Sequence, residues 1–254
     1  SLGTKKALSA PADGHTLLLG SQLDLILAPL SFPSASYAPE DARAIALLGR
    51  TDLMLVARKD LGANSLAELM SLMKSRPDKP LSHCATGTGS LNSLVAERIS
   101  ASAGVPLLAV PYSAMTQCVN ELVAGLIDLA VLPIAGPFPG FVDNGSLKAL
   151  AVFAESAHRR FPKLPPAQAT LGFEGFSASL WASVHVSKMV PDAIAEQLNR
   201  AVYAALANPE VRQTIESTGG TIYAPMTLAQ AQATYLKEVQ RVRDRAKSAG
   251  AGKP

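Results

Sequence analysis

The sequence predicts an α/β fold with mainly parallel sheets flanked by helices. Short apolar strands alternate with stretches of helical periodicity over most of the chain. The clearest junction is the run 81–94 (Leu-Ser-His-Cys-Ala-Thr-Gly-Thr-Gly-Ser-Leu-Asn-Ser-Leu), where a strand enters a glycine-spaced loop and then a helix. The last third is mainly helical, which indicates a scaffold around this alternation.

The first elements are marked by turn and capping signals. The turn 11–14 introduces a buried strand at 16–20, and a second strand is expected at 52–57. Ser65 and Glu68 form a capping box, with serine at the cap and glutamate at the third helical position. A helix with an apolar inner face is therefore expected directly after Ser65.

Four more elements continue the alternation after the glycine loop. They are a strand at 107–110, a helix at 115–124, and strands at 128–132 and 147–153. Strands that are joined through helices pair in parallel, so this order predicts a mainly parallel sheet.

The closing part contains three helices. Pro191 begins the first, and Asn208-Pro209 begins a shorter one that ends at Gly219-Gly220. Thr227 and Gln230 form a second capping box, which opens the terminal helix.

Composition narrows the classes of function. The chain has 254 residues, 48% hydrophobic and 17% charged, which is enough for an ordinary core and for two lobes. The net charge is +3 and the basic residues are dispersed apart from a group at 237–247, so nucleic acid is not expected as a partner. The most apolar stretch, 122–142, contains Asp128 and three prolines, and we expect no transmembrane helix there. The absence of a signal peptide excludes nothing, because a mature secreted chain would have lost it.

The sequence contains no pattern typical of an active site or a metal site. The four histidines lie in no recognisable motif, and Gly-x-Ser-x-Gly, His-x-x-x-His and Cys-x-x-Cys are all missing. We therefore expect no enzyme, no cofactor and no metal. Cys84 and Cys118 permit one disulfide and do not require it. For His83, beside the glycine loop, the favoured interpretation is a strand residue packed against a neighbouring element.

The glycine loop is suited to a small anion. Its two glycines let a ligand approach the backbone, and the first-turn amides of the next helix carry the positive end of the helix dipole. A dinucleotide fingerprint would need a glycine at Asn92 and an acidic residue near 107–112, and a Walker loop would need a lysine before Ser90. Neither pattern is present, which leaves carboxylates above all. A plain strand-to-helix turn remains the alternative from spacing alone.

Several runs along the chain occur together, and in the same order, in one protein family. They are 13–21 (Asp-Gly-His-Thr-Leu-Leu-Leu-Gly-Ser), 85–90 (Ala-Thr-Gly-Thr-Gly-Ser), 110–112 (Val-Pro-Tyr), 145–152 (Gly-Ser-Leu-Lys-Ala-Leu-Ala-Val), Trp181, Pro191 and 208–212 (Asn-Pro-Glu-Val-Arg). In this order they resemble the extracytoplasmic solute receptors of tripartite tricarboxylate transporters, often called Bug-type proteins. The resemblance spans nearly all 254 residues.

The resemblance implies a two-lobed periplasmic binding protein of type II-like fold. Such a protein captures a small carboxylate-bearing solute in a cleft between its lobes and delivers it to the membrane permease subunits of the transporter. Lobe one would comprise 1–57 and 183–254, and lobe two 58–182. The resemblance also implies a periplasmic location and a monomer. One alternative is a small-molecule sensor that uses the same cleft to signal to a membrane protein, and another is an enzyme built on this fold.

Carried over by position, the resemblance assigns nine ligand-binding residues. Ser21 and Gln22 would lie at the rim of lobe one. From lobe two, Ala85, Thr86, Gly87, Thr88, Gly89, Ser90 and Tyr112 would face them. Family members also begin with a strand, a Pro-x-x-Ala-Gly-Gly-type loop and a long helix, and the matching runs of this sequence start after them; either the sequence is truncated or the protein lacks these first-lobe anion contacts. Ser93 stands where a histidine is common in the family, so the family is better defined than the ligand.

Overall fold

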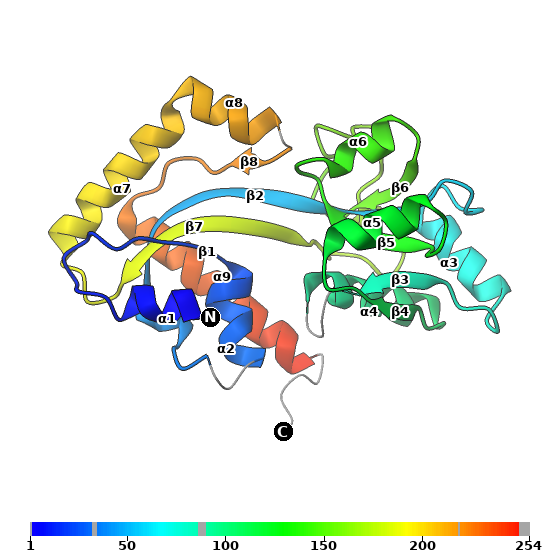
Figure 1. The fold of residues 1–254 in the computed structure, drawn as a ribbon, viewed down its shortest axis with the longest axis horizontal. Coiled ribbons are helices and arrows are strands. Elements are labelled where there is room, and N and C mark those ends of the chain that lie inside the picture. Colours follow the sequence, from blue (N-terminus) through cyan, green and yellow to red (C-terminus); the bar gives the residue numbers. More distant parts are fainter. Residues whose placement is uncertain (1, 32–34, 86–89, 218, 249–254) are drawn as a thin grey trace. The chain divides into compact units, whose positions relative to one another are not determined.

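The computed structural model describes residues 2–31, 35–85, 90–217 and 219–248, and the chain divides into two compact units (Figure 1). The first unit comprises residues 1–50 and 180–254, and the second comprises 51–179. Two long strands, β2 (Ala42–Arg58) and β7 (Ser179–Ser187), contribute to both units.

The first unit is a small sheet with helices. Strand β1 (Leu18–Ser21) pairs antiparallel with β7, which neighbours β2, and β8 (Thr221–Ile222) pairs antiparallel with β2 at Gly49 and Arg50. The helical elements are α1 (Leu2–Leu8), a π-helical turn (Leu23–Leu27), α2 (Ala28–Ser31), a 3₁₀ turn (Pro39–Asp41), α7 (Asp192–Ala207), α8 (Pro209–Ser217) and α9 (Leu228–Ser248).

The second unit is a five-stranded sheet in the order β6-β2-β5-β3-β4. Its strands besides β2 are β3 (Ser82–Ala85), β4 (Leu108–Pro111), β5 (Leu129–Pro133) and β6 (Leu147–Val152). Its helical elements are α3 (Leu66–Ser75), α4 (Leu91–Ala103), α5 (Met115–Val123), α6 (Phe138–Asp143) and a 3₁₀ turn (Ala167–Ala169).

The α/β fold class is confirmed, and the strand directions refine it. Parallel pairing occurs between β3 and β4 and between β3 and β5, which are the strands joined through the crossover helices α4 and α5. Strand β2 runs antiparallel to β5, β6 and β8. The sheets are therefore mixed rather than mainly parallel as the sequence predicted, because β2 runs against β5, β6 and β8, and β1 runs against β7.

Each unit has its own core. In the second unit, buried side chains of β2 and β5 pack with α5; they include Met54, Val56, Ala130, Leu132, Val119 and Leu122. In the first unit, Trp181 of β7 packs edge to face against Tyr235 of α9, with 6.2 Å between ring centroids. The core of the second unit also includes Cys84 of β3, the strand that leads to the candidate site.

The predicted capping box at Thr227 is complete, whereas at Ser65 the serine cap is present but the Glu68 side chain bonds the amide of Asn64 instead of that of Ser65. The Ser65 hydroxyl accepts a hydrogen bond from Glu68 N at 3.2 Å, and the Glu68 carboxylate accepts one from Asn64 N at 2.8 Å. At α9, Thr227 Oγ1 accepts from Gln230 N at 3.2 Å, while Gln230 Oε1 accepts from Thr227 N at 2.9 Å. The caps satisfy amide groups that the helix itself leaves without partners, so they set where α3 and α9 begin.

Asp128 ties together the ends of three strands in the second unit. Its Oδ1 accepts a hydrogen bond from Arg58 Nε at 2.8 Å, and its Oδ2 accepts from Ser82 N at 2.8 Å and Ser82 Oγ at 2.9 Å. Burial by itself would raise the pKa of Asp128, but the hydrogen bonds from Arg58 and Ser82 outweigh it and hold that pKa below the ordinary value of 3.8.

The depressed pKa of Asp128 predicts a pH-dependent effect on stability. A carboxylate whose pKa is lower in the folded state stabilises the fold above its unfolded pKa, and this contribution is lost as the pH falls through the folded pKa. Asp128→Asn should therefore lower the free energy of unfolding at about pH 6, with the deficit shrinking toward about pH 3. Urea unfolding of both proteins across this range measures the difference. A deficit that does not change with pH would contradict the role given to the charge.

Candidate ligand-binding site

The glycine loop leaves β3 at Ala85 and enters α4 at Ser90, and the structure describes these two end residues. Ala85 ends β3, and its carbonyl accepts a hydrogen bond from Tyr112 N at 2.8 Å, so the structure brings these two predicted residues together. Ser90 is the N-cap of α4, where its Oγ accepts from Ser93 N at 3.2 Å and lies 3.0 Å from Ser93 Oγ. The other predicted loop residues, Thr86, Gly87, Thr88 and Gly89, lie outside the described residues.

Helix α4 offers a favourable N-terminus to an anion. It runs for 13 residues, and no acidic residue lies in its first turn. The first amides of a helix have no carbonyl partner within it and carry the positive end of the dipole. A carboxylate placed there would meet donors and no like charge.

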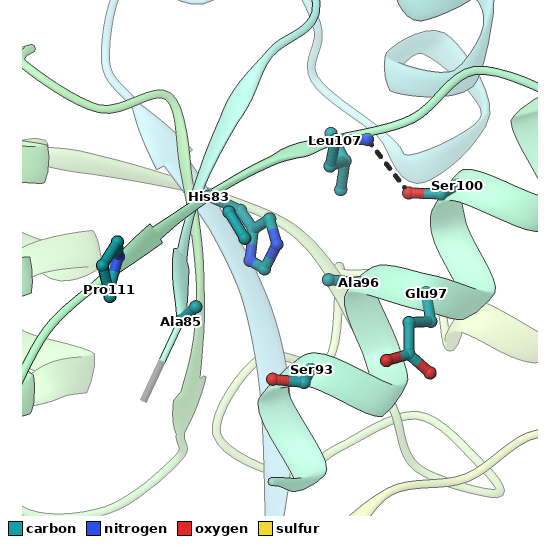
Figure 2. Close-up of a pocket in the computed structure, with 9 residues that line it drawn as sticks. His83, Ala85, Ser93, Ala96, Glu97, Ser100, Leu107 and Pro111 are labelled. Atoms are coloured by element: carbon teal, nitrogen blue, oxygen red, sulfur yellow. Dashed lines mark hydrogen bonds between the residues drawn. The ribbon is translucent and has the colours of Figure 1, made fainter. Parts of the chain in front are cut away.

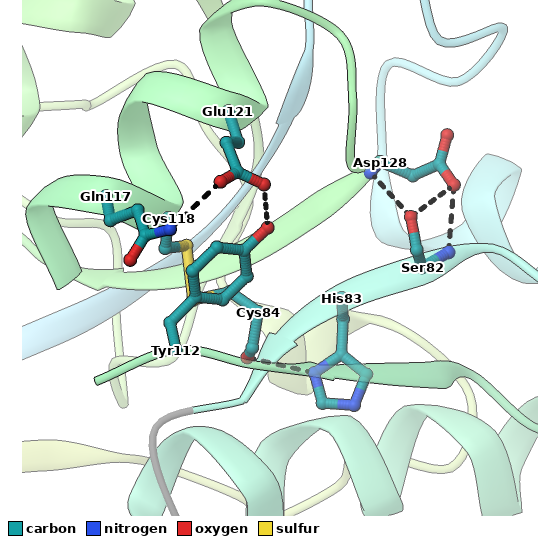
Figure 3. The surroundings of a disulfide bond; sticks show 8 residues. All are labelled: Ser82, His83, Cys84, Tyr112, Gln117, Cys118, Glu121 and Asp128. Atoms are coloured by element: carbon teal, nitrogen blue, oxygen red, sulfur yellow. Dashed lines mark hydrogen bonds between the residues drawn. A yellow bond between two sulfur atoms is a disulfide. The ribbon is translucent and has the colours of Figure 1, made fainter. Parts of the chain in front are cut away.

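Tyr112 is buried, and its hydroxyl has a partner. The hydroxyl donates to Glu121 Oε2 at 2.5 Å, and Gln117 Nε2 donates to the other Glu121 oxygen at 3.2 Å (Figure 3). Burial, followed by the neighbouring Glu121 carboxylate, raises the pKa of Tyr112 to about 12. Tyr112 is therefore a neutral residue that links the end of β4 to α5.

Cys84 and Cys118 form a disulfide that joins β3 to α5 (Figure 3). Both residues are buried, with 6.0 Å between their Cα atoms, in the same core cluster as Tyr112. Cys84 directly precedes Ala85. The disulfide thus fixes the strand end from which the glycine loop departs.

Ser21 and Gln22 lie in the first unit, where β1 leads into the π-helical turn. The Ser21 hydroxyl donates to Asp24 Oδ2 at 2.8 Å and accepts from Leu23 N at 3.2 Å. Gln22 caps the π-helical turn and is buried. The hydrogen bonds of Ser21 hold the strand-to-helix turn in shape.

A pocket of about 590 Å³ lies beside α4 in the second unit (Figure 2). Its volume is within the range of small-molecule sites. Alternate residues of two neighbouring strands form one wall. They are His83 and Ala85 of β3, Ala109 and Pro111 of β4, and Leu107, which directly precedes β4. The facing wall comes from one side of α4, through Ser93, Ala96, Glu97 and Ser100.

His83 is one of the polar residues that line the pocket, and it is a buried strand residue, as the sequence interpretation favoured. It is 8% exposed, and its Nδ1 donates to the Cys84 carbonyl at 3.0 Å. Burial lowers the pKa of His83, more than the Cys84 carbonyl and the Glu97 carboxylate raise it. The ring is therefore neutral near pH 7.

Spacing could have identified this wall. On α4, the four lining residues occupy positions i, i+3, i+4 and i+7, which share one face of a helix. The lining residues of the two strands alternate, as residues on one face of a strand do. The sequence does not show that α4 and the strands leave a pocket between their facing sides, because this depends on how α4 packs on the sheet.

The comparison with protein families identifies the chain. Residues 1–247 match the family described as tripartite tricarboxylate transporter family receptor. The chain belongs to this receptor family. The match agrees with the resemblance drawn from the sequence runs, and the family is one of transporter receptors, in line with the expectation that the chain is not an enzyme.

Individual relatives agree with the family. Protein BugT of Bordetella pertussis is 30% identical over 224 residues, which cover 87% of this chain and 67% of that protein. A protein encoded in the tcbD-tcbE intergenic region of a Pseudomonas strain is 27% identical over 86% of this chain and 64% of its own length. The chain thus spans about two thirds of the length of these curated relatives.

Solved structures with the same fold include a periplasmic binding protein and a protein that holds malate. The periplasmic binding protein BugD is 25% identical, with a TM-score of 0.82 over 100% of this chain and 84% of that one. MatC from Rhodopseudomonas palustris, solved with bound malate, is 26% identical, with a TM-score of 0.78 over 96% of this chain and 83% of that one. The expectation of a periplasmic-binding-protein fold is confirmed.

Neither a metal centre nor a membrane-spanning helix occurs in the part of the chain that the structure describes. No group of three or more histidine, cysteine, aspartate or glutamate side chains in that part of the chain is arranged to hold a metal ion. Among the same residues, no helix has the length and apolar character needed to cross a membrane.

Proposed function

We propose that this protein is an extracytoplasmic receptor that binds a small carboxylate-bearing solute and delivers it to the permease subunits of a tripartite tricarboxylate-type transporter. The observation that carries the proposal is the family match over residues 1–247. The bound malate of MatC supports a carboxylate as the chemical class, and the N-terminus of α4, free of acidic residues, is suited to it.

The proposed site keeps the residues carried over from the family. The solute's carboxylate is received by the amides and hydroxyls of Thr86, Gly87, Thr88, Gly89 and Ser90 at the start of α4. Ser21 and Gln22 of the first unit and Ala85 and Tyr112 of the second complete the proposed ligand set. The Tyr112 hydroxyl donates to Glu121 and the residue is buried, so its place in the proposed ligand set rests on its position in the family pattern.

A periplasmic location is part of the proposal. The Cys84–Cys118 disulfide supports it, because disulfides persist in the bacterial periplasm and are rare in the cytosol. The receptor acts as a monomer in this proposal, as receptors of this type are expected to do.

A thermal-shift screen tests the proposal. The purified protein is heated with dicarboxylates, tricarboxylates, aromatic monocarboxylates and amino acids, each against a matched uncharged amide. A ligand that binds only the folded state stabilises it by about 2.7 kcal/mol at a hundredfold excess over its dissociation constant. At least one acid should raise the melting temperature while its amide does not. No shift with any acid, on a chain that includes the family's preceding strand, loop and helix, would contradict the proposal.

Ser90→Ala should weaken binding of the best acid by about 1 kcal/mol, because one hydroxyl beside the carboxylate is lost. Ser90 also caps α4, so the variant should lose about 1 kcal/mol of stability as well. Ser65→Ala is the matched control, since Ser65 caps α3 in the same way. Calorimetric titration should show weaker binding for Ser90→Ala and unchanged affinity for Ser65→Ala. Equal affinities in both variants would remove Ser90 from the site.

A further inference from the structure

In the pocket beside α4, His83 Nε2 is a hydrogen-bond acceptor with no partner among the described residues. The Cys84 carbonyl can only accept, so the 3.0 Å contact requires His83 Nδ1 to carry the proton. The neutral ring then has a lone pair on Nε2. This nitrogen has no hydrogen-bond partner among the described residues, and the ring points from β3 toward α4, into the pocket (Figure 2).

The charged side chain that lines the pocket is negative. Glu97 is the one charged side chain among the described residues that line it, and no lysine or arginine does so. Ser100 Oγ accepts a hydrogen bond from Leu107 N at 3.1 Å, which closes one end of the pocket (Figure 2). Besides the polar residues His83, Ser93, Glu97 and Ser100, the wall is apolar and is formed by Ala85, Ala96, Leu107, Ala109 and Pro111.

An apolar wall with a carboxylate and a bare imidazole nitrogen is complementary to a cationic donor. An ammonium group has donors for both acceptors, and hydrogen bonds between charged partners are the stronger ones. A second carboxylate would instead meet the like charge of Glu97 without a basic partner.

The pocket begins close to the start of α4, so a cationic group in it would lie near the carboxylate of the proposed function. Ser93 lines one end of the pocket and contacts Ser90, the cap of α4, at 3.0 Å. Glu97 lies seven positions after Ser90 on the same helix, a rise of about 10 Å. The two groups of an α-amino acid share one carbon and are too close together to reach both places.

We propose that the solute is an ω-amino acid, with its carboxylate at the N-terminus of α4, an apolar chain along the pocket and its ammonium group between Glu97 and His83. This inference rests on the proposed function, since it takes the carboxylate position from it. It adds the class of solute and names His83 and Glu97 as the residues that determine specificity.

Three probes of equal chain length test the inference by calorimetric titration at low salt. Hexanoate carries one carboxylate, 6-aminohexanoate adds an ammonium group at the far end, and adipate adds a second carboxylate there. The protein should bind 6-aminohexanoate about fivefold or more tightly than hexanoate, and adipate most weakly. Low salt limits the screening of the exposed Glu97 charge.

Charge variants at Glu97 test the residue itself. Glu97→Gln should remove most of the advantage of 6-aminohexanoate over hexanoate, and Glu97→Lys should reverse the order so that adipate binds most tightly. Both changes are at an exposed helix position, so the fold should be retained. Glu155→Gln is the matched control, because Glu155 is an exposed carboxylate outside the pocket, and the order of the three probes should not change.

The outcomes separate this inference from the proposed function. Equal affinity for hexanoate and 6-aminohexanoate overturns the inference and leaves the carboxylate receptor intact. Tighter binding of adipate than of 6-aminohexanoate by the unmodified protein also overturns it. If none of the three probes binds, the inference is overturned, and the thermal-shift screen by itself decides the proposed function.

Discussion

Replacing Cys84 and Cys118 together with alanine is expected to lower the free energy of unfolding by about 3 to 4 kcal/mol. The disulfide closes a loop with a sequence separation of 34, and a crosslink of this span restricts the unfolded chain by about that amount. It also joins two buried positions in the core of the second unit. Urea unfolding followed by far-ultraviolet circular dichroism measures the loss.

A reductant provides the control for this prediction. Dithiothreitol should destabilise the unmodified protein by a similar amount and leave the double variant unchanged. Thiol titration of the denatured, non-reduced protein should detect no free cysteine. Two free thiols in that assay, or a double variant as stable as the parent, would contradict the structural role of the disulfide.

The same disulfide has a consequence for binding. Cys84 lies one residue before Ala85, where the glycine loop begins, and Cys118 holds it to α5. Without this crosslink the end of β3 is held by its strand neighbours and by the Tyr112 N to Ala85 O hydrogen bond. The reduced protein is therefore expected to bind its acid more weakly as well as unfold more easily.

Phe153→Ala is expected to cost about 3 to 5 kcal/mol of stability, as large-to-small changes of buried aromatic residues do. Phe153 is completely buried, and its ring packs against Phe173 and Phe176 with centroid distances of 6.3 Å and 6.0 Å. Its backbone hydrogen bonds to Leu53 and Ala178 remain in the variant, so the loss measures the side chain. Chemical unfolding of the variant gives the value.

Phe176→Ala is the comparison for this prediction. Phe176 belongs to the same aromatic cluster and is partly exposed, so its removal should cost clearly less than removal of Phe153. Equal losses in the two variants, or a loss below about 1 kcal/mol for Phe153→Ala, would show that the cluster is not a packed core.

Local signals in the sequence were sufficient for the elements that carry their own start signals. The caps at Ser65 and Thr227 and the run from the 81–85 strand into the helix at Leu91 all depend on residues within a few positions of one another. Hydrogen bonds from a cap to the first turn do not require the rest of the fold, which is why their patterns can be read directly.

The long strands were underestimated for the opposite reason. The sequence predicted a strand at 52–57, whereas β2 extends from Ala42 to Arg58. Its first part includes Arg43, Gly49 and Arg50, which interrupt any apolar alternation, and pairing with β7 and β8 stabilises it. Strand formation depends on such partners more than on the residues of the strand itself.

The sequence indicated the parts of the candidate site that depend on neighbouring residues, but not the contacts between elements that are distant in sequence. The structure places Ala85 at the end of β3 and Ser90 at the N-cap of α4, at the two ends of the loop that the sequence delimits, and their role in binding an anion stays a prediction. The bond from Tyr112 to Glu121 depends on how α5 packs on the sheet, as does the pairing of Cys84 with Cys118 that the sequence left open. Contacts of this kind are tertiary, and no local pattern specifies them.

The most direct test of the central claim is a calorimetric titration of the protein with its most stabilising acid and, separately, with the corresponding carboxamide. The amide keeps the shape of the acid and loses its charge. We expect one binding site for the acid and an affinity at least about tenfold weaker for the amide, since hydrogen bonds to a charged group are the stronger ones. Equal affinity for acid and amide would contradict recognition of a carboxylate at the start of α4.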